Sequence, residues 1–166
     1  THVVDSRKTI PGLRLAQKYA VRVGGGANHR VGLYDGILIK ENHIATAGGV
    51  TAALKDAYAI VAAPDVAARP VAPFIQIEVE RLDQLTEALQ AGAKMVLLDN
   101  MTHEQIAEAV RINRAQFNGQ AVLEVSGNVS LDNIRSYAEL GVDRISSGSL
   151  TKHIRATDYS MRVNAV

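Results

Sequence analysis

The sequence predicts an α/β fold in which about six parallel strands form a barrel, incomplete or complete, with helices on its outside. Short apolar runs alternate along the chain with longer stretches of helical periodicity, as in a sheet built from repeated strand–helix units. Polar and charged residues gather where the apolar runs end, and in such folds that edge of the sheet carries the active site. The length of 166 residues suits a single domain.

The strands are predicted at short runs rich in Val, Ile and Leu. They are expected at residues 2–7, 36–40, 74–80, 95–99, 121–126 and 144–147. In the run 74–80 apolar residues alternate with Gln76, Glu78 and Glu80, so these polar residues share one face. Because a barrel strand has one face under the helices and the other toward the lumen, the polar face is expected to point inward.

The helices are predicted between the strands. They are expected at residues 11–23, 49–62, 82–91, 102–116 and 130–140. Pro11 suits a first helical turn, and Thr102 with Gln105 has the spacing of a capping box. Residues 63–73, rich in Ala and Pro, are expected to form a surface connection rather than a domain linker.

Composition excludes several classes of protein. Lys and Arg number 18 against 17 Asp and Glu, so a net charge of +1 gives no electrostatic case for binding nucleic acid or an anionic membrane. The absence of cysteine excludes a disulfide scaffold and a thiolate metal site. No apolar stretch approaches the roughly 20 residues of a membrane span. We therefore expect a soluble, cytoplasmic protein, and the start without Met favours a carboxy-terminal domain cut from a longer chain.

Three polar clusters in the first quarter of the chain predict an anion-binding pocket. They occupy residues 5–9, 28–30 and 38–43, and each follows an apolar run or a Gly-rich turn. Their cationic side chains are Arg7, Lys8, Arg30 and Lys40. Because the chain as a whole is nearly neutral, this local excess indicates one site for a small ligand with several negative charges.

Two later segments have the composition of a phosphate cradle. Ser126, Gly127 and Asn128 follow one predicted strand, and residues 146–149, Ser-Ser-Gly-Ser, follow the last. Small residues let a phosphate approach backbone N–H groups, and barrels often bind phosphate after their final strands. Ser and Gly also fill ordinary turns, so neither segment is specific by itself.

Residues 5–14, 18–22, 24–30, 38–44, 78–80, 97–100, 123–128 and 150–153 closely resemble quinolinate phosphoribosyltransferase. The match is collinear over essentially the whole chain. The resemblance implies conversion of quinolinate and phosphoribosyl pyrophosphate into nicotinate mononucleotide, pyrophosphate and CO2, with Mg²⁺, in de novo NAD biosynthesis. It also implies an open, TIM-barrel-like catalytic domain over residues 1–166, with the family's amino-terminal α/β sandwich domain absent from this chain.

The resemblance assigns residues to three roles. Those that match the quinolinate-binding positions are Ser6, Arg7, Lys8, His29, Arg30 and Lys40. Those that match the phosphoribosyl pyrophosphate-binding positions are Glu78, Asp99, Ser126, Gly127, Asn128, Ser147, Gly148 and Ser149. Glu78 and Asp99 match the acids that hold the ribose of phosphoribosyl pyrophosphate and Mg²⁺, the metal directly or through water, and both acids together with Lys40 are expected to be catalytic.

The chemistry expected is displacement at the anomeric carbon of ribose, in which the pyridine nitrogen attacks as pyrophosphate leaves. The pyridinium charge then makes the ring an electron sink for loss of the adjacent carboxylate. The family suggests a homodimer or larger homo-oligomer, in which a neighbouring subunit's amino-terminal domain supplies a further arginine. The 166-residue chain alone is therefore expected to be weakly active or inactive.

Three alternatives remain open at this point. A ModD-like molybdenum-transport protein shares the Arg-Lys-Thr-x-Pro-Gly opening of residues 7–12. A fragment of the enzyme could act only as a binding or assembly module, without catalysis. A nicotinate-using phosphoribosyltransferase is the third alternative, although the several cations suit two carboxylates better than one.

Overall fold

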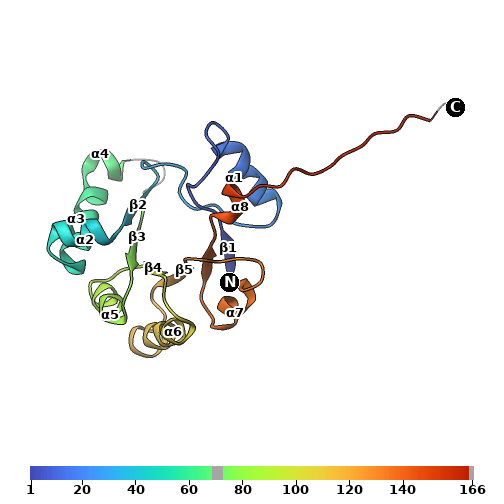
Figure 1. Ribbon diagram of the computed structural model, residues 1–166. Coiled ribbons are helices and arrows are strands. Elements are labelled where there is room, and N and C mark those ends of the chain that lie inside the picture. Colours follow the sequence, from blue (N-terminus) through green and yellow to red (C-terminus); the bar gives the residue numbers. More distant parts are fainter. Residues whose placement is uncertain (69–72, 165–166) are drawn as a thin grey trace.

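The sheet of this protein is an open parallel barrel, as the sequence predicts. The computed structural model describes residues 1–68 and 73–164. Its six strands are all parallel and lie in the order β1-β6-β5-β4-β3-β2. The strands are β1 His2–Val4, β2 Gly36–Ile39, β3 Phe74–Val79, β4 Met95–Asp99, β5 Val122–Ser126 and β6 Arg144–Ser146. The sheet curls, but its end strands β1 and β2 do not pair within the described residues (Figure 1).

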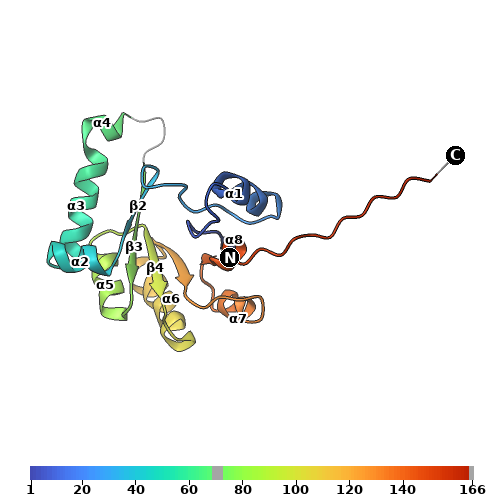
Figure 2. The same cartoon turned by 45° about the horizontal axis from the view of Figure 1, so that its top comes forward.

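Eight helices are present in the described residues, and most cover the outer face of the sheet (Figure 2). They are α1 Arg14–Val23, α2 Glu41–Ala47, α3 Val50–Ala62, α4 Pro64–Ala67, α5 Leu82–Gln90, α6 His103–Phe117, α7 Ile134–Glu139 and α8 Ser149–Lys152. The predicted capping box begins α6, where Thr102 Oγ1 accepts from the N–H of Gln105 and Gln105 Oε1 accepts from the N–H of Thr102.

The structure departs from the predicted elements mainly at their ends. The first strand stops at Val4 rather than at residue 7, and beside β6 it forms one further parallel bridge, between Val4 and Ala27. The last predicted helix begins at Ile134 rather than at residue 130, since Asn133 Oδ1 first accepts from the N–H of Ser130 in a turn.

Three helices were not predicted. Helix α2 follows β2 directly and ends where Gly48 adopts a φ of 88°, which separates it from α3. Helix α4 occupies part of the predicted connection 63–73, of which residues 69–72 lie outside the described part. Helix α8 is a short helix after β6.

The hydrophobic core lies between the sheet and its helices. Ile77 and Val79 of β3 are fully buried there, together with Leu85 of α5, Leu98 of β4 and Ile106 of α6. The other face of the strands turns toward the inside of the curled sheet and carries polar side chains such as Glu78 and Glu124 beside Leu38 and Leu97. The alternation predicted for the third strand is confirmed for Gln76 and Glu78, whereas Glu80 lies beyond the end of β3 and is exposed.

Two further features concern the outside of the molecule. After α8 the chain leaves the body as an exposed, extended segment (Figure 1). No helix in residues 1–68 and 73–164 is long and apolar enough to cross a membrane.

Candidate active site

One large pocket opens at the carboxyl ends of the strands, inside the curl of the sheet. Its volume is about 900 Å³, and residues at or just beyond the ends of all six strands line it. Every residue that the sequence assigned to quinolinate, phosphoribosyl pyrophosphate, metal or catalysis lies on its wall. The structure thus brings the predicted site residues together in one cavity. It does not test the separate role given to each.

One wall of the pocket is cationic and consists of Arg7, Lys8 and Arg30. A buried carboxylate holds this cationic wall in place. Asp5, which is fully buried at the end of β1, accepts from Lys18 Nζ at 2.5 Å, Asn28 Nδ2 at 2.6 Å and the backbone N–H of His29 at 2.8 Å. Lys18 Nζ also donates to the carbonyl oxygen of His29 at 2.9 Å. These bonds connect β1, α1 and the loop before β2, so they fix the loop that carries His29 and Arg30 into the pocket.

His29 faces the pocket as a neutral ring. Its Nδ1 accepts from the backbone N–H of Arg30 at 2.8 Å, so the proton resides on Nε2, which donates to Gln76 Oε1 at 2.6 Å. Burial lowers the pKa of His29 below its usual value, although the carboxylate of Glu124 acts in the opposite direction. His29 therefore offers a fixed hydrogen-bonding edge, not a positive charge, at neutral pH.

Two arginines at the cationic wall donate hydrogen bonds to backbone carbonyl oxygens. Arg30 is 9 % exposed, and its Nη1 donates to the carbonyl of Gly36 at 2.9 Å, which fixes the plane of the guanidinium. Burial, followed by the charge of Arg7, lowers the pKa of Arg30. Arg14 donates to the carbonyl oxygens of Arg7 and Val31, both at 3.1 Å, and so holds the loop that presents Arg7 and Lys8.

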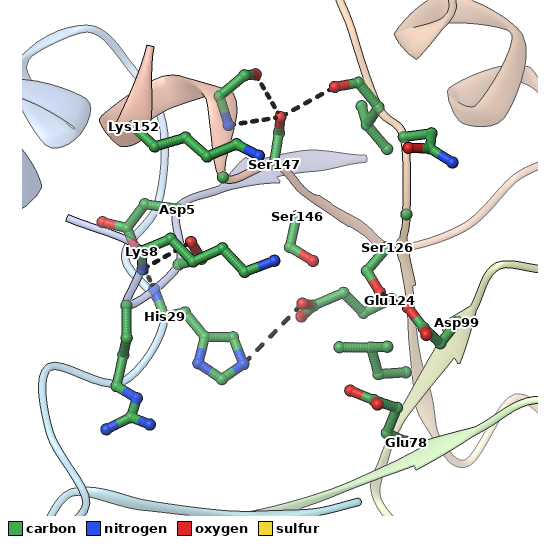
Figure 3. Close-up of a pocket in the computed structure, with 18 of the residues that line it drawn as sticks. Asp5, Lys8, His29, Glu78, Asp99, Glu124, Ser126, Ser146, Ser147 and Lys152 are labelled. Carbon is green, nitrogen blue, oxygen red and sulfur yellow. Dashed lines mark hydrogen bonds and ion pairs between the residues drawn. The ribbon is translucent and has the colours of Figure 1, made fainter. Parts of the chain in front are cut away.

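The acidic wall comes from β3 and β4 (Figure 3). Both carboxylate oxygens of Glu78 accept from Lys40 Nζ, each at 2.9 Å. Lys40 is therefore not a free cation in this structure. Burial raises the pKa of Glu78, the pairing with Lys40 opposes that shift, and the charge of Asp99 adds to it.

Asp99 is held at the top of the sheet by its neighbours. It accepts from Ser126 Oγ at 2.6 Å and from Asn100 Nδ2 at 2.8 Å. The strand register places Asp99 directly opposite Ser126, which explains this pair. In residues 1–68 and 73–164 no set of three or more His, Asp or Glu side chains could hold a metal ion by itself. Glu78 and Asp99 are suitable oxygen ligands for Mg²⁺ only if a bound ligand or water supplies the remaining oxygens.

Small residues form the third wall, after β5 and β6. Ser147 Oγ lies 2.6 Å from Ser149 Oγ within the second predicted cradle, and it donates at 3.2 Å to the carbonyl oxygen of Val129, the residue that follows the first. A Cβ on Gly148 would lie 3.3 Å from Cδ of Lys8 and 3.4 Å from Ser6 Oγ. Glycine thus lets the turn after β6 approach the loop after β1 closely.

Replacing Gly127 with alanine is expected to destabilise the protein by about 2–3 kcal/mol. Gly127 has a φ of +100°, and an added Cβ would overlap Oδ1 of Asn100, so strain and a clash combine. Gly25→Ala is the matched control, because Gly25 has a φ of +87° but nothing within 4 Å of an added Cβ. Urea unfolding measures both variants. Equal losses would show that the contact with Asn100 contributes nothing.

The sequence-based assignment missed four pocket or lumen residues. Arg14 supports the loop after β1, and Gln76 Oε1 accepts a hydrogen bond from His29 Nε2. Glu124 of β5 is fully buried and lines the pocket, while Arg144 of β6 places its Nε 3.4 Å from Glu124 Oε2. A signal for Glu124 was present: it stands between Leu123 and Val125, which pack in the core, so alternation points it into the lumen.

Comparisons with known proteins point to one family. A family model described as "Quinolinate phosphoribosyl transferase, C-terminal domain" matches residues 1–162. The chain is 44 % identical over 160 residues to a nicotinate-nucleotide pyrophosphorylase (carboxylating) of Mycobacterium leprae, covering 95 % of this chain and 52 % of that protein. The corresponding protein of Homo sapiens is 38 % identical over 167 residues, covering 99 % and 52 %.

Solved structures agree with these relatives. The nicotinate-nucleotide pyrophosphorylase from Francisella tularensis has a TM-score of 0.82 at 49 % identity, covering 93 % of this chain and 51 % of that chain. A thiamine phosphate pyrophosphorylase from Pyrococcus furiosus, at 16 % identity and a TM-score of 0.55, shares only the fold. The chain spans about half the length of the curated relatives it matches.

Proposed function

The chain belongs to the quinolinate phosphoribosyltransferase family, and from this premise we propose that it carries the catalytic pocket of a carboxylating nicotinate-nucleotide pyrophosphorylase. The reaction joins quinolinate to phosphoribosyl pyrophosphate and gives nicotinate mononucleotide, pyrophosphate and CO2. One observation carries the proposal: a single cavity sets a cationic wall opposite a wall of carboxylates, with small polar residues between them. The relatives named above are pyrophosphorylases, which favours this function over molybdenum transport.

The cationic wall suits a dicarboxylate. Arg7 and Lys8 follow β1, and Arg30 lies in the loop before β2, so the wall has three positive charges on two segments of chain. Arg30 offers a planar guanidinium whose orientation is already fixed by Gly36, and such forks bind carboxylates through paired hydrogen bonds. The His29 ring, which is buried and neutral, also lines this wall.

The opposite walls suit the phosphoribosyl donor. Gly127 and Gly148 line the pocket beside Ser126, Ser147 and Ser149, and small polar residues of this kind suit a 5′-phosphate. We assign Mg²⁺ to Glu78 and Asp99, where it would offset the negative charge of the departing pyrophosphate. Lys152, which also lines the pocket, adds positive charge near the same turn.

The residues of this chain would act mainly by orientation and charge. The arginines would fix quinolinate so that its ring nitrogen faces the anomeric carbon, and this positioning can supply much of the rate. As the C–O bond to pyrophosphate breaks, positive charge develops on the sugar, and the carboxylates of Glu78 and Asp99 would stabilise it. Lys40, released from Glu78 by a small movement, would reach the substrates' negative charge.

The test is a direct assay on the natural full-length protein. Incubation with quinolinate carrying ¹⁴C in the 2-carboxylate, phosphoribosyl pyrophosphate and Mg²⁺ should release ¹⁴CO2 and form one equivalent of nicotinate mononucleotide. Nicotinate in place of quinolinate should give no product. Protein that is folded by circular dichroism and binds both substrates without turnover would support the non-catalytic binding module instead.

The raised pKa of Glu78 predicts a pH effect on stability. The native state holds this proton more tightly than the unfolded chain, so Glu78 stabilises the fold fully below its ordinary pKa of 4.5. That contribution is lost as pH rises through the raised native pKa. Urea unfolding between about pH 4 and pH 8 should therefore show that Glu78→Gln gains stability relative to wild type as pH rises. Glu139→Gln, at an exposed site on α7, should track wild type. A difference in the free energy of unfolding between Glu78→Gln and wild type that does not change with pH would contradict this prediction.

A further inference from the structure

Glu124 is the one carboxylate of the pocket that lacks a hydrogen bond among the described residues. It lies on β5 with no exposed surface, yet it lines the pocket, and neither Oε1 nor Oε2 has a hydrogen-bond partner. Figure 3 shows its carboxylate directed across the cavity toward His29, between the cationic and the small-residue walls. Buried acceptors are almost always satisfied, so a ligand group is expected to satisfy these two.

The neighbours of Glu124 compensate its charge but leave its oxygens open. Arg144 Nε lies 3.4 Å from Oε2, and Arg144 is not part of the pocket wall, so its charge acts from the register-paired position on the neighbouring strand β6. His29 Nε2 lies 4.0 Å from Oε1, but its N–H already donates to Gln76 Oε1. The pocket side of the carboxylate is thus the side from which hydrogen-bond donors must come.

The chemistry of the proposed substrates selects one donor group, and this step rests on the proposed function. Quinolinate at neutral pH carries two carboxylates, and phosphoribosyl pyrophosphate carries phosphate oxygens; all of these are acceptors with negative charge, which Glu124 would repel. The hydroxyl groups on C2 and C3 of the ribose are the remaining donors. A sugar hydroxyl can donate to a carboxylate in a short, charge-assisted hydrogen bond.

The strand register indicates where the ribose would lie in the pocket. Glu78 of β3, Leu97 of β4 and Glu124 of β5 stand in one row across the sheet, because Leu97 pairs with both glutamates. Leu97 also lines the pocket, so an apolar side chain separates two carboxylates on the floor. A ribose above Leu97 would turn its carbon face to the leucine and its hydroxyl groups to the acids.

We propose that Glu124 binds the ribose hydroxyl groups of the phosphoribosyl donor and of the nucleotide product, and so makes the pocket selective for ribose over deoxyribose. This assignment adds a third acid to the site. It differs in function from the assignment of Glu78 and Asp99, because it requires no metal and no charge on the ligand.

The test is a binding cycle in the full-length protein, with nicotinate mononucleotide and its 2′,3′-dideoxy analogue as probes. Wild type should bind the analogue about 10- to 100-fold more weakly than the natural nucleotide. Glu124→Ala should bind the natural nucleotide more weakly and gain less binding energy from its hydroxyl groups, so that the ratio between the two affinities falls at least about threefold. Quinolinate affinity should not fall, because quinolinate has no hydroxyl group for Glu124 to bind and the variant removes a carboxylate that would repel it.

Two further variants keep the result interpretable. Glu124→Gln retains the shape and one acceptor oxygen, so it should fold as wild type does and show an intermediate preference for the hydroxyl groups. Glu139→Ala removes an exposed glutamate of α7 outside the pocket and should preserve the full preference. A Glu124→Ala protein that still discriminates between the probes as wild type does would overturn the inference. If wild type binds neither quinolinate nor the nucleotide, the proposed function itself fails.

Discussion

Arg30→Ala is expected to weaken quinolinate binding by about a hundredfold or more, while the affinity for phosphoribosyl pyrophosphate changes little. Arg30 is almost fully buried, and the carbonyl of Gly36 fixes its guanidinium before any ligand arrives. A preorganised cation in a partly desolvated pocket loses little side-chain entropy on binding, so its removal forfeits most of a strong, charge-assisted interaction. Isothermal titration with each substrate separately measures the two affinities.

Two control variants separate charge from geometry. Arg30→Lys keeps the positive charge but lacks the planar fork, so it should recover only part of the lost affinity. Arg135→Ala removes an exposed arginine of α7 outside the pocket and should leave both affinities unchanged. If Arg30→Ala bound quinolinate as tightly as wild type, the assignment of the dicarboxylate to this wall would be wrong.

The sheet and the location of the pocket could be predicted because they depend on local periodicity. The alternation in residues 74–80 is enough to decide which side chains point inward, and the structure places Gln76 and Glu78 in the lumen as expected. Polar residues that end parallel strands must meet at one edge of the sheet, so cations and acids far apart in sequence were expected in one cavity. The helices missed by the prediction are short, and α2 begins directly after β2, where the run of polar residues 40–43 suggests a loop.

The partners inside the pocket could not be predicted, because they depend on side-chain distances across the barrel. The sequence predicts that Lys40 binds an anionic ligand, but in this structure its Nζ is paired with the carboxylate of Glu78. Nothing in the sequence marks Lys18 of the amphipathic helix α1 as buried, but it is 3 % exposed and paired with Asp5. Nothing in the sequence between them indicates that contact, which forms only when α1 packs beside β1 and the loop before β2.

Lys18→Met is expected to reduce the free energy of unfolding by about 3–5 kcal/mol, the largest effect on stability that we predict. Methionine retains much of the apolar stem of lysine but removes the charge that lies 2.5 Å from Asp5 Oδ1. The buried carboxylate would keep its bonds from Asn28 and from the backbone of His29, but it would have no counter-charge in contact. Urea unfolding followed by circular dichroism measures the loss.

The exposed pair of Arg81 and Asp83 provides the control. Their side chains are 62 % and 69 % exposed with Nη2 and Oδ2 2.9 Å apart, so Arg81→Met should change stability by less than about 1 kcal/mol. The double variant Asp5→Asn with Lys18→Met should recover part of the loss, because the uncompensated charge is then gone. This double variant should still bind quinolinate less tightly than wild type. In wild type Lys18 also donates to the carbonyl oxygen of His29 and thereby holds the loop that carries Arg30. A Lys18→Met variant as stable as wild type would mean that Asp5 needs no cation, and the loop would then depend on its backbone contacts alone.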